Sequence, residues 1–192
     1  MRLYEDALEA SAEAVRKGKG GEDNSQGYAL SDDSAARDKE LAARKYALAH
    51  QQSVEQVLQS CARPEDRQVA AWLVGYESQS RKQIALLERA SRDEDDTVRN
   101  NAVRALGVLA RSNSKIASEI PPNSFIEMLN SGTWTDRNKA GGLLMELSKN
   151  RNPKLLQQLK STALPSLVEM AKWDPDHAYA YRVLLGRIAG FR

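Results

Sequence analysis

The chain has 192 residues, enough for one ordinary domain or for a short array of repeats. It is 41% hydrophobic, 28% charged and only 6% aromatic, a composition that favours helix over sheet. The formal net charge is +2, with −3 on residues 1–62 and +5 on residues 63–192. A charge this small argues against a nucleic-acid partner.

Cysteine and histidine are too sparse for several kinds of site. Cys61 is the single cysteine, so the chain can form no intramolecular disulfide and no cysteine metal site, and we interpret Cys61 as a small buried hydrophobe. His50 and His177 stand far apart in the sequence. We therefore expect no metal and no cofactor, and no small-molecule substrate is evident.

The sequence also bears on the compartment. No stretch approaches the roughly 20 apolar residues of a membrane span. The first 20 residues carry acids where a signal peptide needs an apolar core. As written, the sequence predicts a soluble cytoplasmic chain without an export signal.

The first 50 residues differ in kind from the rest. Apolar residues at helical spacing predict one amphipathic helix over 2–17 and a second helix over 33–50. The glycine-rich polar stretch between them, about 18–33, is either a flexible linker or an ordered loop, and it lacks the spacing of a phosphate-binding loop. We expect residues 1–50 to cap the open end of a repeat domain over 51–192.

Four later stretches share one pattern of small and apolar residues. When the stretches are aligned, the equivalent positions are Val74, Leu106, Leu144 and Leu185. These positions are 32, 38 and 41 residues apart, which fits one helix pair per step of a helical solenoid. The stretches are DRQVAAWLVGY from Asp66, VRNNAVRALGVLA from Val98, DRNKAGGLLMELS from Asp136 and HAYAYRVLLGRIA from His177.

Each repeated helix has an expected partner helix upstream, and prolines such as Pro64 and Pro165 punctuate helix starts. Residues 152–161 predict an extra short helix in the last step. The predicted fold is all-α, a right-handed α-solenoid of about four helix pairs with an N-terminal helical cap. The expected partner helices are 53–60, 81–90, 125–130 and 164–173.

The acids DEDD at 93–96 are either a metal loop or the turn before a helix. A calcium loop needs a glycine at its sixth position and a glutamate at its twelfth, and both are missing. Carboxylates in such a turn accept the free N–H groups of the following helix and lie at its positive dipole end. The pattern therefore indicates a capping turn.

Three arginines occupy the same place in successive units. Arg67, Arg99 and Arg137 each stand three residues before an alanine of the shared register. We expect a structural ladder in which each arginine reaches an acid or a carbonyl in its own or the neighbouring turn. The alternative is that they line a groove and bind an acidic partner. The expected carboxylate partners are Asp66, Asp95, Asp96 and Asp136.

The second unit resembles the second helix of a HEAT repeat, an armadillo-like motif. The resemblance rests on Asp95, Asp96, Val98, Arg99, Ala102 and Leu106, and it covers roughly residues 50 to 192 with looser copies in the first and third units. The fourth unit departs from the pattern, because His177 and Ala178 replace the Val-Arg pair. HEAT repeats imply a fold and hardly any function.

Four segments are also similar to the repeat-bearing part of certain uncharacterised bacterial HEAT-repeat proteins. They are GGEDNSQGYALS (20–31), DTVRNNAVRAL (96–106), SGTWTDRNKA (131–140) and LPSLVEMAKW (164–173). Such segments often follow another domain, and several look exported, so the resemblance implies that the chain is a fragment and that an extracytoplasmic place is open. It also implies a fixed loop between Gly20 and Ser31. The loop residues in question are Glu22, Asp23, Ser25 and Gln26.

Serine, histidine and acidic residues are scattered without a nucleophile motif, so nucleophilic catalysis finds no support. The stretch TWTDRNKAG (133–141) suggests one enzymatic alternative. Some HEAT-like proteins are alkylpurine DNA glycosylases, and here Trp134 with Asp136 would be the reacting pair, with Arg137 and Lys139 near phosphate. A lyase-like HEAT module that attaches a chromophore is a further enzymatic reading. Against the glycosylase, Asp136 stands where HEAT units keep a capping acid.

The function that we expect is a non-enzymatic scaffold for protein–protein interaction. In the second unit, one helical face should be buried, and it carries Val98, Ala102, Ala105, Leu106 and Leu109. The opposite face, mapped onto the other units, carries amide, aromatic and arginine side chains, which are typical of a groove for a peptide or protein. The alternative is a solvated face, with Trp72 packed on the N-terminal cap. The predicted partner-binding residues are Gln68, Trp72, Asn100, Arg104, Asn138 and Tyr179.

Overall fold

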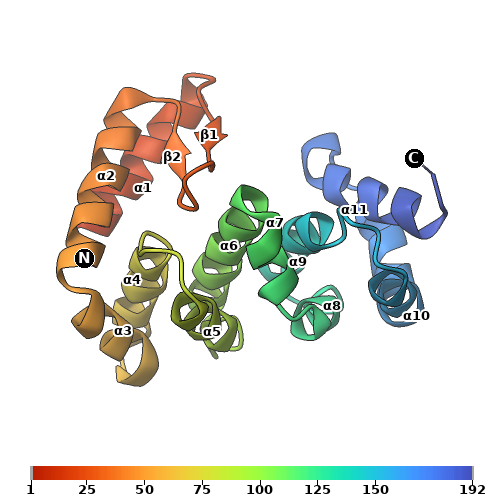
Figure 1. Ribbon diagram of the computed structural model, residues 1–192. Helices are drawn as coiled ribbons and strands as arrows, with labels where there is room; N and C mark the ends of the chain where they lie inside the picture. Colours follow the sequence, from red (N-terminus) through yellow and green to blue (C-terminus); the bar gives the residue numbers. More distant parts are fainter. Residues whose placement is uncertain (1, 192) are drawn as a thin grey trace. The chain divides into compact units, whose positions relative to one another are not determined.

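The computed structural model describes residues 2–191, and within them eleven helices and one two-stranded sheet (Figure 1). The chain divides into two compact units, the first ending at Asn113 and the second beginning at Ser114. The all-α architecture of helix pairs is confirmed. No helix of the described residues is both long and apolar enough to cross a membrane.

Unit 1 contains three pairs of helices. Its elements are α1 (Arg2–Arg16), β1 (Glu22–Asp23), β2 (Leu30–Ser31), α2 (Ser34–Ala49), α3 (Gln51–Ser60), α4 (Pro64–Val74), α5 (Arg81–Ala90) and α6 (Asp96–Ser112). α1 packs on α2, α3 on α4 and α5 on α6, and α4 also packs on α6. The two short strands pair antiparallel, Glu22 with Ser31 and Asp23 with Leu30, which gives the glycine-rich segment a fixed core.

Unit 2 has the same plan with fewer helices. Its elements are α7 (Ser114–Glu119), α8 (Asn123–Met128), α9 (Trp134–Leu147), α10 (Pro153–Met170) and α11 (Pro175–Ile188). α8 packs on α9, α10 on α11, and α9 also packs on α11. The predicted division at residue 50 stays a prediction.

One prediction in this unit is wrong. The expected short helix over 152–161 and the expected helix over 164–173 are a single helix, α10, with Pro165 inside it. The fixed φ of proline suits a helix, so Pro165 removes one backbone hydrogen bond without ending the helix. The buried residues Leu159, Ala163 and Leu167 lie on both sides of Pro165 and hold the two halves together.

The buried face predicted for the second repeat is confirmed. Val98, Ala102, Leu106 and Leu109 of α6 are fully buried. They recur at intervals of three and four residues and so form one stripe of the helix. In the α1–α2 hairpin, small residues such as Ala7, Ala14, Ala36, Ala43 and Ala47 are buried instead, and they allow the two helices to approach closely.

The acids of the turn before α6 are engaged in local hydrogen bonds. Asp95 is the N-cap of α6 and accepts the N–H of Val98 at 2.9 Å. Asp93 accepts the N–H of Asp95 at 2.9 Å and binds the guanidinium of Arg67. Within the described residues, no group of three His, Cys, Asp or Glu side chains is placed to hold a metal ion.

Arg67 joins two successive turns of unit 1. Its guanidinium donates to both carboxylate oxygens of Asp93, at 2.9 and 2.8 Å, and to the carbonyl oxygens of Cys61 and Ala62 in its own turn. The carboxylate partners are therefore Asp93 and, at 3.2 Å, Glu94, and not Asp66 or Asp95. Burial raises the pKa of Asp93, but the hydrogen bonds from Arg67 and from the N–H of Asp95, together with the charges of Arg67 and Arg99, bring the pKa below its ordinary value.

The other two arginines of the predicted ladder make related contacts. Arg99 donates to the carbonyl oxygens of Asp93 and Glu94, both at 2.9 Å. Arg137 donates to both carboxylate oxygens of Glu169 and lies over the ring of Trp173, 5.1 Å from its centroid. The carboxylate that pairs with Arg137 thus comes from α10 and not from Asp136.

A buried pair of carboxylates lies near the end of α4. Glu55 and Glu77 are both almost fully buried, and the amide of Gln51 donates to each of them, at 3.0 and 3.4 Å. Lys82 pairs with Glu55, whereas one carboxylate oxygen of Glu77 has no partner. Burial and then the charge of Glu55 raise the pKa of Glu77 to about 8.

We predict that replacing Arg67 by alanine lowers the free energy of unfolding by about 3–5 kcal/mol, because Asp93 is left buried without its cation. Arg67→Lys should recover only part of this loss, since lysine cannot bind both carboxylate oxygens and two carbonyls in one plane. Urea unfolding measures both variants. A loss below about 1 kcal/mol for Arg67→Ala, the size typical of an exposed pair, would contradict the pairing.

We also predict that Glu77 makes unit 1 less stable at alkaline pH. A carboxyl whose pKa is raised in the folded state contributes stability below its ordinary pKa of 4.5, and this contribution is lost as the pH rises toward about 8. Glu77→Gln should therefore melt at a higher temperature than the wild type at pH 9, and the difference should shrink toward pH 5. A difference that is the same at both pH values would refute this assignment.

Candidate interaction face

The six residues of the predicted partner face lie on four helices. Gln68 and Trp72 come from α4, Asn100 and Arg104 from α6, and all four belong to unit 1. Asn138 comes from α9 and Tyr179 from α11, in unit 2. That all six residues form one continuous face stays a prediction.

In unit 1, Trp72 lies within an aromatic cluster. Its ring contacts Tyr4 of α1 and Tyr76 after α4, each with ring centroids 5.2 Å apart. Trp72 is therefore packed against the N-terminal helix, as the alternative interpretation of the face expected. It remains only half-buried, because its other side borders a cavity.

A buried asparagine that the sequence reasoning missed organises this region. Asn101 donates its amide to the hydroxyl of Tyr4 and to the carbonyl of Gln68, both at 3.0 Å. Gln68 in turn donates to Asp95, at 3.2 Å. The signal for Asn101 was its place beside Ala102 on the buried stripe of α6, where a polar residue needs a partner.

Arg104 is held by the N-terminal segment. Its guanidinium forms an ion pair with Glu22 of β1, and both side chains are about one third exposed. Farther along the segment, the side-chain amide of Gln79 donates a hydrogen bond to the backbone carbonyl oxygen of Gln26, at 3.3 Å. The segment therefore covers part of the face predicted to bind a partner.

The segment from Gly20 to Ser31 is an ordered loop. Asp23 accepts the N–H of Ser25 at 2.9 Å, and Ser31 donates its N–H to the buried carboxylate of Glu40. Gly27 has a φ of 82°, and a Cβ there would lie 1.7 Å from the amide nitrogen of Gln79. Only glycine fits this position without strain.

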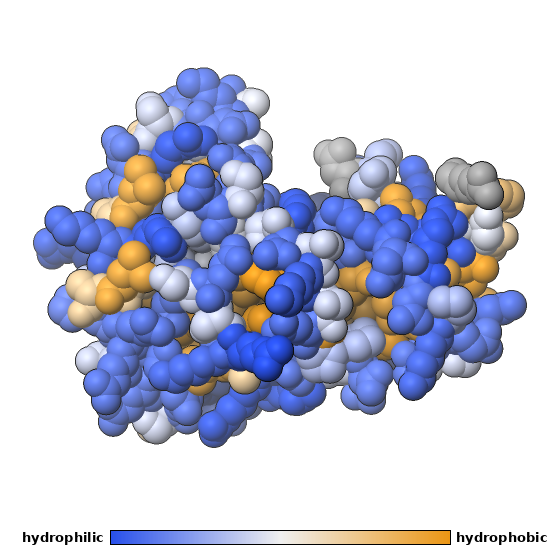
Figure 2. Space-filling view, viewed as in Figure 1, coloured by the Kyte–Doolittle hydropathy of each residue, from blue (hydrophilic) through white to orange (hydrophobic). Residues whose placement is uncertain are grey.

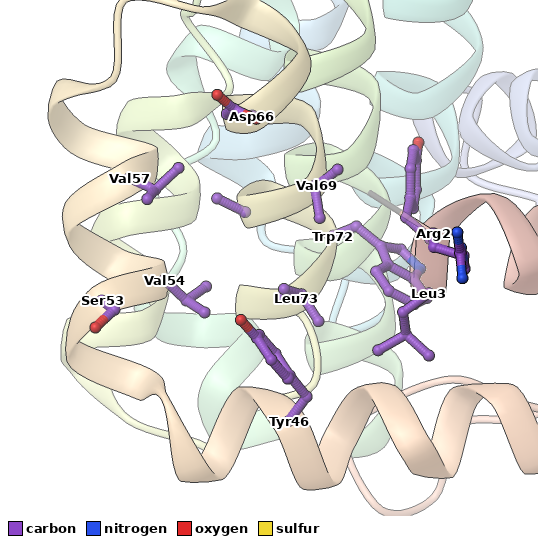
Figure 3. A pocket seen from close by; sticks show the side chains of 12 residues that line it. Arg2, Leu3, Tyr46, Ser53, Val54, Val57, Asp66, Val69, Trp72 and Leu73 are labelled. Carbon is purple, nitrogen blue, oxygen red and sulfur yellow. The ribbon is translucent and has the colours of Figure 1, made fainter.

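A cavity of about 460 Å³ opens on the other side of Trp72 (Figure 3). It is enclosed by side chains of α1, α2, α3 and α4, and most of these are apolar. Asp66, one of its few charged groups, is paired with Arg63 at 3.5 Å. The walls suit an apolar group. The labelled side chains in Figure 3 are Arg2, Leu3, Tyr46, Ser53, Val54, Val57, Asp66, Val69, Trp72 and Leu73.

Cys61 differs from its expected place. It is half-buried rather than fully buried, and its Sγ lies 3.6 Å from a carboxylate oxygen of Asp66. The residue follows the last turn of α3, where the chain turns toward α4 at the edge of the packed helices.

In unit 2, an aromatic cluster surrounds the start of α9. Trp134 stacks on Trp173 with ring centroids 6.4 Å apart, and it meets the ring of His177 edge-on at 5.0 Å. Tyr181 contacts Trp173 and donates its hydroxyl to the carbonyl of Arg137 at 3.0 Å. Trp134 nevertheless keeps 46% of its surface exposed.

Tyr179 of α11 is more exposed still, at 64%, and Asn138 of α9 is half-buried. Exposed aromatic side chains of this size are over-represented where proteins bind other proteins. In unit 2, Trp134, Tyr179 and Phe191 thus present aromatic rings to solvent, whereas in unit 1 Tyr46 is exposed and Trp72 is packed against its own chain.

The residues of the glycosylase hypothesis are engaged in structural contacts. Asp136 is 4% exposed and accepts the hydroxyl of Ser131 at 2.9 Å, beside the start of α9. Arg137 binds Glu169 and Trp173, and Lys139 is half-buried. The carboxylate of Asp136 is therefore buried and hydrogen-bonded at the start of α9.

Comparison with known proteins identifies the fold and no family. No family model matches the chain, and no curated protein matches it in sequence. An engineered protein of known structure is 19% identical over 84% of this chain and 78% of its own, with a TM-score of 0.59.

Two further solved structures are designed armadillo repeat proteins. One, in complex with the peptide (KR)4, is 16% identical over 82% of this chain and 78% of its own, with a TM-score of 0.56. The other, computationally designed for modular peptide recognition, is 14% identical over 100% of this chain and 91% of its own, with a TM-score of 0.54. At this identity the likeness concerns the fold, while the expected likeness to bacterial proteins stays a prediction.

We predict that Asn101 and Tyr4 are energetically coupled. Asn101→Leu removes a buried donor and should lower the free energy of unfolding by about 1–3 kcal/mol, because the carbonyl of Gln68 and the hydroxyl of Tyr4 lose their partner. In a Tyr4→Phe background the same change should cost less. Urea unfolding of the double-mutant cycle measures the coupling, and strictly additive losses would show that the hydrogen bond contributes nothing.

These observations leave the chain with an armadillo-type helical-repeat fold. In unit 1 the N-terminal segment contacts Arg104 of α6, and in unit 2 Trp134 and Tyr179 are exposed.

Proposed function

We propose that the chain is a non-enzymatic helical-repeat scaffold that binds a protein or a peptide on the helix faces carried by α4 and α6 in unit 1 and by α9 and α11 in unit 2. The observation that carries this proposal is the exposure of Trp134 and Tyr179 on two of these helices. Burying such surfaces in a partner removes a large apolar area from water, which is the main source of affinity at protein interfaces.

The comparisons support the coarser half of the proposal. Helical repeats present extended surfaces, and two of the similar solved structures are described as peptide-binding designs. The contacts of Asp136 and Arg137 favour a scaffold over the glycosylase, because both side chains stabilise the start of α9. The identity of the partner rests on experiment.

The test is capture of a partner from the native host, followed by titration of that partner against variants of the full chain. Tyr179→Ala and Trp134→Ala should each weaken binding about tenfold or more, as expected for aromatic residues central to an interface. Val168→Ala is the matched control, since Val168 is also an exposed apolar residue but lies on α10. Circular dichroism checks that each variant is folded.

Equal affinity of the partner for the wild type and both aromatic variants would place the interface elsewhere and overturn the proposed face. Release of alkylated bases from DNA by the wild type, abolished in Asp136→Asn, would instead favour the enzyme.

A further inference from the structure

The cavity beside Trp72 in unit 1 has the size of a binding site for a small molecule. It measures about 460 Å³ and is formed by side chains of α1, α2, α3 and α4. Ligand pockets usually measure roughly 300–1,000 Å³, and many lie between helices that pack together. Because an apolar cavity of roughly 150 Å³ holds the six carbons of benzene, this one has room for a chain of roughly ten carbons.

Most of the cavity wall is aliphatic and belongs to α3 and α4. Val54, Ala70 and Leu73 are buried to within a few per cent, and Val57 and Val69 are half-buried. Figure 3 shows Val57 on α3 and Val69 on α4 among the side chains that line the cavity. A ligand that covers this wall removes apolar surface from water, which raises its affinity about threefold to fourfold for each buried methylene.

Two charged side chains line the cavity, and they differ in their partners. Asp66, in the first turn of α4, forms an ion pair with Arg63 at 3.5 Å and accepts the thiol of Cys61 at 3.6 Å. Arg2, the first residue of α1, is exposed and forms no ion pair with an acid of residues 2–191. An anionic group on a ligand therefore finds an unpaired cation at Arg2, whereas a cationic group would compete with Arg63 for Asp66.

The walls of the cavity come from two helix pairs that are joined beside it. Tyr4 of α1 contacts Trp72 of α4 with ring centroids 5.2 Å apart, and its hydroxyl accepts the amide of Asn101 at 3.0 Å. A molecule in the cavity contacts the α1–α2 pair and the α3–α4 pair at once. Its binding should therefore hold α1 more firmly against α4.

We propose that this cavity binds a single-chain aliphatic carboxylate of about eight to ten carbons, with its chain against α3 and α4 and its carboxylate at Arg2. The planar guanidinium can bind both carboxylate oxygens. This inference goes beyond the proposed function, because the ligand is a small molecule and the cavity contains neither Trp134 nor Tyr179.

The experiment titrates hexanoate, octanoate and decanoate into the full chain and measures binding by calorimetry. Affinity should rise about threefold to fourfold for each added methylene, because each one leaves water for the aliphatic wall. The melting temperature should rise with the concentration of decanoate, since a ligand that binds the folded state stabilises it. Hydrogen exchange of α1 should slow in the presence of decanoate.

A variant that fills the cavity tests the location of the chain. Val57→Phe places a ring among the wall residues and should weaken decanoate binding about tenfold or more, while the ligand-free protein keeps its melting temperature or melts higher. Val168→Phe is the matched control, because it makes the same change at an exposed valine of α10. This control should bind decanoate as the wild type does.

A second variant tests the location of the carboxylate. Arg2→Gln should weaken octanoate binding about fivefold, near the upper size of an exposed ion pair, and should leave the affinity for 1-octanol unchanged. Arg89→Gln is the matched control, since Arg89 is also exposed but lies on α5 and does not line the cavity. Octylamine, with the same chain and a cationic end, should bind more weakly than octanoate.

Several outcomes would overturn the proposal. They are affinities that do not change with chain length, decanoate binding that survives Val57→Phe, and octylamine that binds more tightly than octanoate. Equal losses of octanoate and 1-octanol in Arg2→Gln would also contradict the assignment of the carboxylate. If Val57→Phe does not fold, Val69→Leu takes its place with the same expected direction. Failure here together with success of the Trp134 and Tyr179 test would leave the proposed function intact, and the reverse result would leave the ligand site intact.

Discussion

The packing of α4 on α6 is the contact on which the rest of unit 1 depends, because both the turns and the N-terminal segment are positioned by it. The two helices meet through small and aliphatic side chains, and Ala70, Ala71, Ala102 and Leu106 are buried to within a few per cent. Around this apolar contact, polar groups set the register. Asn101 ties the two helices together through the carbonyl of Gln68.

The turns at one end of these helices are joined by charge. Arg67, in the first turn of α4, binds Asp93 in the turn before α6, so the turns within two successive helix pairs are joined to each other. The pair is largely shielded from water, and Arg67 also donates to Glu94 and to two backbone carbonyls. A desolvated pair of this kind is costly to break and therefore favours one relative placement of neighbouring repeats.

The same helix surface has different surroundings in the two units. In unit 1 it receives Tyr4 and the loop after α1, which bury the aromatic ring of Trp72 on one side. In unit 2 the corresponding helices expose Trp134 and Tyr179. Figure 2 shows hydrophobic residues at the surface among hydrophilic ones on the face in view. The N-terminal part of the chain therefore does more than cover the first helix pair of the repeat domain. Its loop, which depends on Gly27 and carries Glu22, also reaches Arg104 of α6.

The helix class, the spacing of the repeats and the buried stripe of α6 could all be predicted from the sequence, because periodic burial leaves a periodic pattern in the chain. The sequence also predicted that the acids at 93–96 form a turn, since capping is a local interaction between a side chain and nearby N–H groups.

The partners of the polar residues depend on how the helices pack in three dimensions. Asp93 pairs with Arg67 across 26 residues, Glu22 with Arg104 across 82, and Asn101 with Tyr4 across 97. Contacts between residues so far apart in the sequence leave no periodic pattern. The predicted face therefore contained Trp72 and Arg104, but the contacts of Tyr4 and Glu22 with these two residues were not predicted. At Pro165 a local preference gave a wrong prediction. Proline favours the start of a helix, but burial of the apolar residues on both sides of Pro165 keeps it inside α10. Local rules apply to single elements, whereas contacts between elements depend on how the apolar faces pack.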